Sequence, residues 1–195
     1  MRRQTLILSA TCLALTLVLA LPACTTTGPS DTSSEQSNKR QTIDAGVDST
    51  LSRLYDDASG SRELVSKAKG VLIFPSVIDA GFVVGGQYGE GSLRVNGHTV
   101  GYYSTATGSV GWQIGAQSRA IIFLFMTDES LRRFRSTDGW SAGGDASVAV
   151  LKVGANGNVD TSTATGQVEA FVLTNTGLMA GASLEGTKVT RLNSL

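Results

Sequence analysis

Apolar residues after position 70 gather in short runs that have the length of strands. Residues 71–74 and 120–126 are continuously apolar, and residues 168–174 are nearly so. Such runs are typical of strands buried on both faces, because a buried helix needs about ten or more residues. Pro75 is predicted to end the first run, since proline donates no hydrogen bond to a strand ladder. Further strands are expected at 98–104, 110–116, 145–153 and 178–189.

Glycines recur on one face of a strand predicted at 81–95. Gly81, Gly85, Gly89 and Gly91 have the same parity, so they share one face of a pleated strand. A face without side chains permits strong coiling and tight packing of the sheet, which we expect here. The alternative is a ligand lying along the bare backbone. Similar glycine pairs are Gly111 with Gly115 and Gly177 with Gly181.

Two Asn-Gly dipeptides predict tight hairpin turns. Asn96-Gly97 separates the glycine-rich strand from the strand expected at 98–104, and Asn156-Gly157 follows the segment 145–153. Asparagine and glycine adopt the positive φ angles that two-residue hairpin turns require.

Three amphipathic segments predict helices. The first carries its apolar residues on one face: Ile43, Val47, Leu51, Leu54 and Tyr55. The second follows the break at 59–61 and places Leu64, Val65 and Ala68 together. Thr127 is a good N-cap for a third helix at 128–135, with acids in its first turn and arginines in its last. We expect the first two helices to cover the core. The alternative is a membrane-surface helix, in which Arg62, Lys67 and Lys69 meet headgroups. The aspartates of the first helix argue against that role for it.

The predicted fold is therefore α+β and dominated by β-structure. We expect a coiled, glycine-rich antiparallel sheet, or a small barrel or sandwich, with short N-terminal helices and one helix near 128–135. Residues 39–195 form one domain in this interpretation, and they are numerous enough to enclose a core.

The first 24 residues resemble an export signal that ends in a lipidation site. Arg2 and Arg3 precede an apolar stretch at 6–21, and Leu21-Pro22-Ala23-Cys24 follows it. This layout predicts a signal peptide at 1–23 and acylation of Cys24, with chains such as palmitate. An ordinary signal peptide is the alternative. Thr25 follows the cysteine, and this favours the outer membrane, at its periplasmic or surface face. Residues 24–38 are polar and are expected to form a flexible tether.

Composition excludes several classes of function. The chain has 16 basic and 16 acidic residues, and two of the basic ones lie in the leader, so no nucleic-acid partner is expected. Cys24 would be the only cysteine of the mature chain, so no intrachain disulfide is expected. The single histidine, His98, adjoins a turn, and no nucleophile elbow, phosphate loop or zinc-ligand pattern occurs. We predict no catalytic residues, no metal and no cofactor.

The remaining chemical feature is cationic. Arg132, Arg133 and Arg135 crowd the end of the third helix. A solvated helix terminus explains them through the favourable helix dipole. The functional interpretation is a site for anionic headgroups, because guanidinium groups bind phosphate through paired hydrogen bonds. Lys67 and Lys69 are further candidates for lipid contact.

Four sequence blocks together resemble the SYLF domain family. They are residues 69–75, 81–93, 145–148 and 177–186, and the likeness runs in order through about 43–192. The resemblance implies binding of lipid, including phosphoinositides in eukaryotic members, and not catalysis. It also implies actin binding in some fungal members, which is not expected for a protein of a bacterial envelope. Bacterial members are often secreted or lipid-anchored.

Three functions remain open on this basis. The first is a lipid-anchored envelope protein whose domain binds anionic or phosphorylated lipid. The second is a structural or adaptor lipoprotein that docks another envelope protein. The third, an enzyme of unrecognised type, has no motif in its favour.

Overall fold

The computed structural model describes residues 32–81, 84–110, 117–152, 158–159, 166–179 and 181–195. Residues 31–195 form one compact unit. Its described helices are α1 (Thr32–Asp57), α2 (Ser61–Lys67) and α3 (Asp128–Ser136). Its described strands are β1 (Gly70–Gly81), β2 (Val84–Val95), β3 (His98–Val110), β4 (Gln117–Phe125), β5 (Trp140–Ser141), β6 (Val148–Val150), β7 (Val168–Thr174), β8 (Gly177–Leu178) and β9 (Lys188–Arg191).

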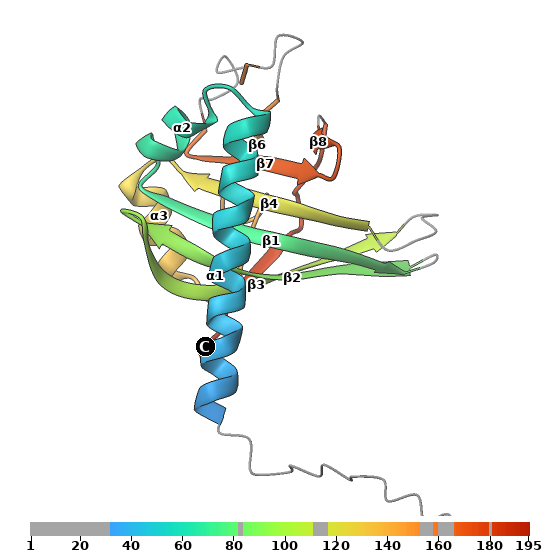
Figure 1. The fold of residues 1–195 in the computed structure, drawn as a ribbon. Helices are drawn as coiled ribbons and strands as arrows, with labels where there is room; N and C mark the ends of the chain where they lie inside the picture. Colours follow the sequence, from blue (N-terminus) through green and yellow to red (C-terminus); the bar gives the residue numbers. More distant parts are fainter. Residues whose placement is uncertain (1–31, 82–83, 111–116, 153–157, 160–165, 180) are drawn as a thin grey trace, which may run out of the picture. The chain divides into compact units, whose positions relative to one another are not determined.

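These nine described strands form one sheet in the order β5-β9-β3-β2-β1-β4-β7-β6, with β8 paired to β7 (Figure 1). The pairs are antiparallel except for β6 with β7, which is parallel. The sheet is therefore mixed, where a fully antiparallel sheet was expected. Residues 151–167 separate β6 from β7, and a connection of that length can join parallel strands, which a tight hairpin cannot. The prediction of a β-dominated α+β fold is confirmed.

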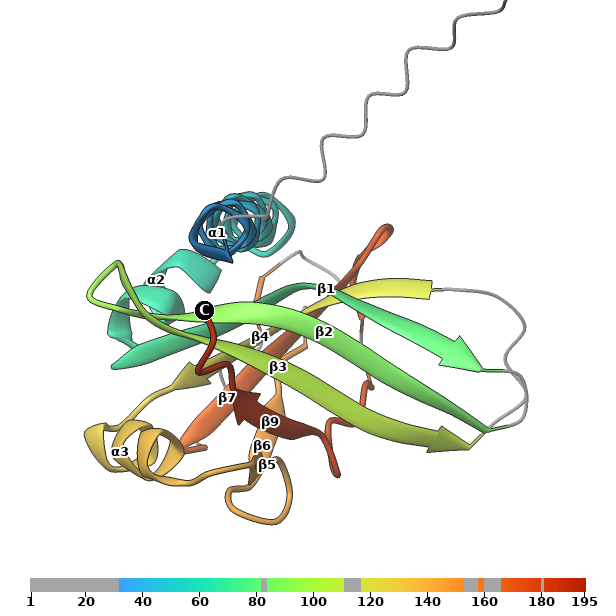
Figure 2. The ribbon, with the colours of Figure 1, turned by 90° about the horizontal axis from the view of Figure 1, so that it is seen from below.

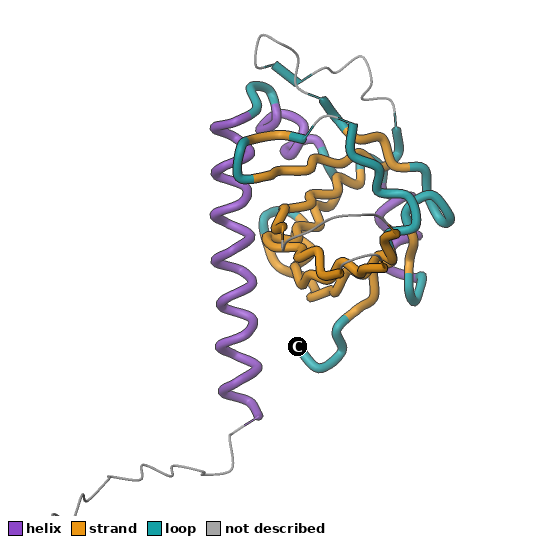
Figure 3. The backbone as a smooth tube through the Cα atoms, turned by 90° about the vertical axis from the view of Figure 1, so that its right-hand side faces the viewer, coloured by secondary structure: helices purple, strands orange, loops and turns teal. Residues whose placement is uncertain are grey.

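The sheet curls until its two end strands come near each other. Figure 3 shows the strands curving around a common axis. β5 and β6 lie at opposite ends of the strand order, yet only six residues, 142–147, connect them in the sequence. Ala142 forms a bridge with Ala146, and the amide of Ala142 donates to the carbonyl of Thr187. This short loop holds the ends together, and the result is a half-barrel.

Hydrophobic residues are buried on both faces of the sheet. The cluster inside the curl joins β-strand residues to α3 and includes Phe74, Phe123, Phe125, Phe134 and Trp140. A second cluster lies under α1 and α2 and includes Ile43, Val47, Leu54, Ile122 and Phe171. Figure 2 shows α1 and α2 on one side of the sheet and α3 on the other. β4 is apolar without alternation because it contributes to both clusters, as predicted.

β1 continues through Pro75, so the prediction that the strand ends there is wrong. The pairing with β2 shifts between Ile73 and Ser76, so Phe74 and Pro75 together stand opposite Gly91. A bulge places one extra residue in a strand and accepts a residue that cannot donate. A Cβ atom on Gly91 would overlap the carbonyl oxygen of Ile73. The glycine face of β2 thus admits the bulged backbone of β1, and Gly89 and Gly91 are buried.

α1 crosses the outer face of the sheet at close range. A Cβ atom on Gly46 would lie 3.0 Å from Cγ of Pro75. The carboxylate of Asp44 accepts hydrogen bonds from Ser92 (3.1 Å), Thr99 (2.9 Å) and Tyr102 (2.8 Å). The apolar contact fixes the helix on β1, and the polar cluster fixes it on β2 and β3.

α1 begins at Thr32 and is 26 residues long, much longer than the short helix predicted. Residues 32–38, expected within the tether, are helical, so that part of the prediction is wrong. The N-terminal portion is largely exposed and extends beyond the strands (Figures 1 and 3). Polar composition hid this segment, because nothing in its sequence marks an apolar face.

Turn chemistry was predictable where the turn is local. Asn96 (φ 51°) and Gly97 (φ 81°) form the β2–β3 turn, as predicted. Gly177 and Gly181 also have positive φ. Gly177 begins β8 directly after the turn that follows β7, and Gly181 lies in a turn, so the two do not form a bare face of one strand. The strands expected at 145–153 and 178–189 are reduced to β6 and to β8 with β9. Of the strand expected at 110–116 only Val110 is described, as the last residue of β3. The leader with Cys24, the pair of Gly111 with Gly115 and the Asn156-Gly157 turn lie outside the described residues.

Candidate functional site

α3 has a clear beginning and a cationic end. The backbone amide of Ser130 donates to Oγ1 of Thr127 (3.1 Å), and the backbone amide of Thr127 donates to Oγ of Ser130 (3.4 Å). These two reciprocal bonds form a capping box. Ser130, Leu131 and Phe134 are buried against the core inside the curl. Because that face is fixed, the arginines between and after these residues project into solvent.

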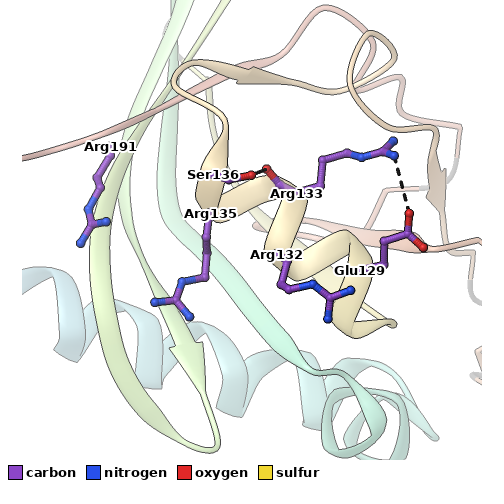
Figure 4. Close-up of a pocket in the computed structure, with 6 residues that line it drawn as sticks. All are labelled: Glu129, Arg132, Arg133, Arg135, Ser136 and Arg191. Carbon is purple, nitrogen blue, oxygen red and sulfur yellow. Dashed lines mark hydrogen bonds and ion pairs between the residues drawn. The ribbon is translucent and has the colours of Figure 1, made fainter.

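The arginines of α3 line an open surface hollow of about 650 Å³, and Arg191 of strand β9 lines it too. Its lining residues are Glu129, Arg132, Arg133, Arg135, Ser136 and Arg191 (Figure 4). Arg132 and Arg135 point to the same side of α3, whereas Arg133 turns toward Glu129. The Arg133–Glu129 distance is 3.7 Å, and both side chains are exposed. Within the described residues, Arg132, Arg135 and Arg191 form no ion pair.

Sequence reasoning missed Arg191. It lies on β9, directly opposite Tyr103 of β3 in the strand register. The ring of Tyr103 packs against Phe134 of α3, with centroids 5.0 Å apart. The strand pairing therefore brings Arg191 to the side of α3 that carries Arg135. No local signal in the segment 188–191 identifies its partner strand.

The positive charge around this hollow affects the pKa of Tyr103. Burial raises the pKa of the Tyr103 phenol, and the guanidinium groups of Arg191 and Arg135 partly offset that rise. Both arginines thus lie within electrostatic reach of one hydroxyl. Guanidinium groups without carboxylate partners suit a phosphate or another multiply charged anion.

Lys67 and Lys69 do not line the arginine hollow. Lys67 ends α2 and its Nζ lies 2.6 Å from the carboxylate of Glu63. Lys69 is exposed between α2 and β1, and its backbone amide donates to the carbonyl of Phe125. The structure thus groups the three α3 arginines with Arg191 and leaves both lysines outside that group.

Other chemistry is sparse in the described part of the chain. His98 is exposed at the first position of β3. No group of three or more His, Cys, Asp or Glu residues among the described ones could hold a metal ion. Likewise, no helix in the described ranges is long and apolar enough to cross a membrane.

Residues 106–194 match the family model described as "Ysc84: Las17-binding protein actin regulator". The matched segment contains β4, α3 and all later strands, and with them Arg132, Arg135 and Arg191. It does not reach the glycine-rich block at 69–93. No curated protein matches the chain.

Proposed function

We propose, from the premise that this chain belongs to the SYLF domain family, that it is an exported lipoprotein whose domain binds anionic membrane lipid. Lipid binding and actin-related binding are properties of the eukaryotic family members, and the family is one of binding domains. In our proposal Cys24 carries the acyl anchor, and the arginine hollow of α3 and β9 contacts headgroups.

The observation that carries the proposal is the set of three arginines that have no acidic partner among the described residues. Arg132, Arg135 and Arg191 come from two elements and surround one open hollow. An open surface suits a plane of headgroups better than a small molecule, which is normally enclosed. Each basic residue near an anionic surface contributes about 1 kcal/mol, so three contribute roughly a hundredfold in affinity.

Three arginines alone bind a membrane weakly, so in our proposal a lipid anchor adds to their affinity. A single acyl chain binds membranes weakly, and stable attachment takes a second signal. Cys24 precedes the first residue of α1 by eight positions, which an extended chain spans in at most about 28 Å. The anchor would supply residence at the membrane, and the arginines would orient the domain.

Vesicle sedimentation tests the lipid contact apart from the anchor. Residues 31–195 contain both core clusters and the whole described sheet, so this fragment is the unit to purify. We expect it to sediment with vesicles that contain phosphatidylglycerol and not with neutral phosphatidylcholine vesicles. The triple variant Arg132→Gln, Arg135→Gln, Arg191→Gln should lose this binding.

A matched triple variant controls for net charge. Lys39 and Arg40 on α1 and Lys152 after β6 are exposed cations outside the arginine hollow, and their replacement by Gln removes the same charge. This control should still bind. Equal loss in both triple variants would show nonspecific attraction, and no binding by the unmodified fragment would end the proposal. Lys67→Gln with Lys69→Gln tests the two lysines in the same assay.

A specific feature also favours the adaptor function. Ile78 and Tyr88 are about half exposed and lie opposite each other on β1 and β2. Large exposed apolar neighbours are typical of protein contact surfaces. In-cell cross-linking from a photoreactive residue at position 78 should capture one envelope protein at constant stoichiometry. A diffuse set of adducts would speak against an adaptor role.

A further inference from the structure

A second hollow lies on the sheet face away from α3, between α1, α2 and the β2–β3 turn. Its volume is about 360 Å³, within the range of roughly 300–1,000 Å³ typical of ligand sites. The apolar part of its wall is formed by Leu51, Val65, Ala68 and Val71, and Tyr55, Arg62 and Arg94 add a ring and two cations.

The apolar wall of this hollow is the partly exposed edge of the hydrophobic cluster under α1 and α2. Val71 belongs to that cluster, and Leu51, Val65 and Ala68 pack against it while remaining partly exposed. α2 has only seven residues, and the chain leaves it at Ala68 in an extended conformation. A helix of that length buries its own Leu64 and leaves this edge open to a ligand.

The two arginines of the hollow differ in their pairing. The Nη2 atom of Arg94 lies 3.0 Å from Asp48 and 3.6 Å from Asp44, so its charge is compensated. Arg62 lies over the ring of Tyr55, with Cζ 4.0 Å from the centroid. Among the described residues no carboxylate pairs with Arg62. As far as the structure describes the chain, the hollow therefore offers one uncompensated guanidinium group, which packs on an aromatic ring beside an apolar wall.

We propose that this hollow binds a single-chain anionic amphiphile, such as a fatty acid. The carboxylate would pair with Arg62, and the alkyl chain would lie against Leu51, Val65 and Ala68. Arg62, the one cation of the hollow without a carboxylate partner in the described ranges, matches one negative charge. A wholly polar anion is disfavoured, because it would cover the apolar wall without gain. The site is separate from the arginine hollow of α3 and does not rest on it.

Calorimetric titration of the fragment 31–195 with decanoate tests the proposal, with decanol and decyltrimethylammonium as comparisons. We expect saturable one-to-one binding of decanoate and binding of the cationic analogue at least about tenfold weaker, since Arg62 repels it. Arg62→Gln should weaken decanoate about tenfold and leave decanol unchanged. Arg40→Gln is the matched control, because Arg40 also lies over a tyrosine ring, that of Tyr102.

Ala68→Phe should fill the hollow and abolish binding, whereas Ala106→Phe, the same change at an exposed strand position, should not affect it. Amide chemical-shift mapping of the unmodified fragment gives an independent readout, and decanoate should shift signals of α2 and residues 94–97. The variant lacking Arg132, Arg135 and Arg191 should bind decanoate normally, which separates this site from the vesicle contact. Equal affinity for the three amphiphiles, or shifts confined to other elements, would overturn the proposal.

Discussion

The contact between Gly91 and the bulge of β1 predicts that Gly91→Ala is strongly destabilising. A Cβ atom at this position would overlap the carbonyl oxygen of Ile73 and lie 2.8 Å from the ring of Phe74. Neither atom can move alone. The oxygen belongs to a central strand, and the ring is fully buried in the core inside the curl.

The expected cost follows from that geometry. Overpacking a core costs about 1–3 kcal/mol when side chains can adjust, and here backbone must shift, so we expect about 3 kcal/mol or more. For a domain of this size that corresponds to a melting temperature roughly 6–12 °C lower. This loss is a large fraction of the 5–15 kcal/mol typical of a folded domain.

Gly86→Ala is the matched control on the same strand. A Cβ atom there would meet only the carbonyl oxygen of Thr107, at 3.8 Å, and its φ is not positive. We expect Gly86→Ala to be neutral or to stabilise by about 0.4–1 kcal/mol, because alanine restricts the unfolded chain. Urea denaturation of both variants, followed by circular dichroism, measures the difference. If Gly91→Ala unfolds at the same urea concentration as Gly86→Ala, the reasoning about the bulge is wrong.

Three further predictions concern other parts of the fold. Asp44→Ala leaves three hydroxyl donors without their acceptor and should lower the free energy of unfolding by about 1–3 kcal/mol. Because α1 is then held less firmly on the sheet, trypsin should cleave faster at Lys39 and Arg40. Unchanged cleavage would contradict the role of Asp44 in holding α1. Burial raises the pKa of Glu169. The free energy of unfolding therefore falls as the pH rises above the ordinary pKa of glutamate, because the folded state disfavours the ionised carboxylate. Glu169→Gln should therefore raise the melting temperature at pH 8 and not at pH 4, and an equal gain at both would refute this. Thr127→Ala removes the N-cap of α3 and should cost about 1 kcal/mol, whereas Thr127→Ser should retain stability in the same denaturation assay.

Local sequence determined the features that depend on neighbouring residues. The cap at Thr127 and the Asn96-Gly97 turn are satisfied within a few residues, so their positions could be predicted. The apolar runs of β4 and β7 identified central strands, because no other short structure buries every side chain. The arginines of α3 could be placed at a solvated helix terminus, because cations are favourable beside the C-terminal end of the helix dipole.

Only the tertiary structure decided what depends on distant pairing. Pro75 lies within β1 because Gly91, sixteen residues later, leaves room for a bulge. Arg191 joins the arginines of α3 because β9 pairs with β3 in one register, and a strand's own sequence does not specify its partner. The polar start of α1 is helical although its sequence carries no apolar stripe. Sequence periodicity describes one element at a time, and a site built from several elements exists only once they pack together.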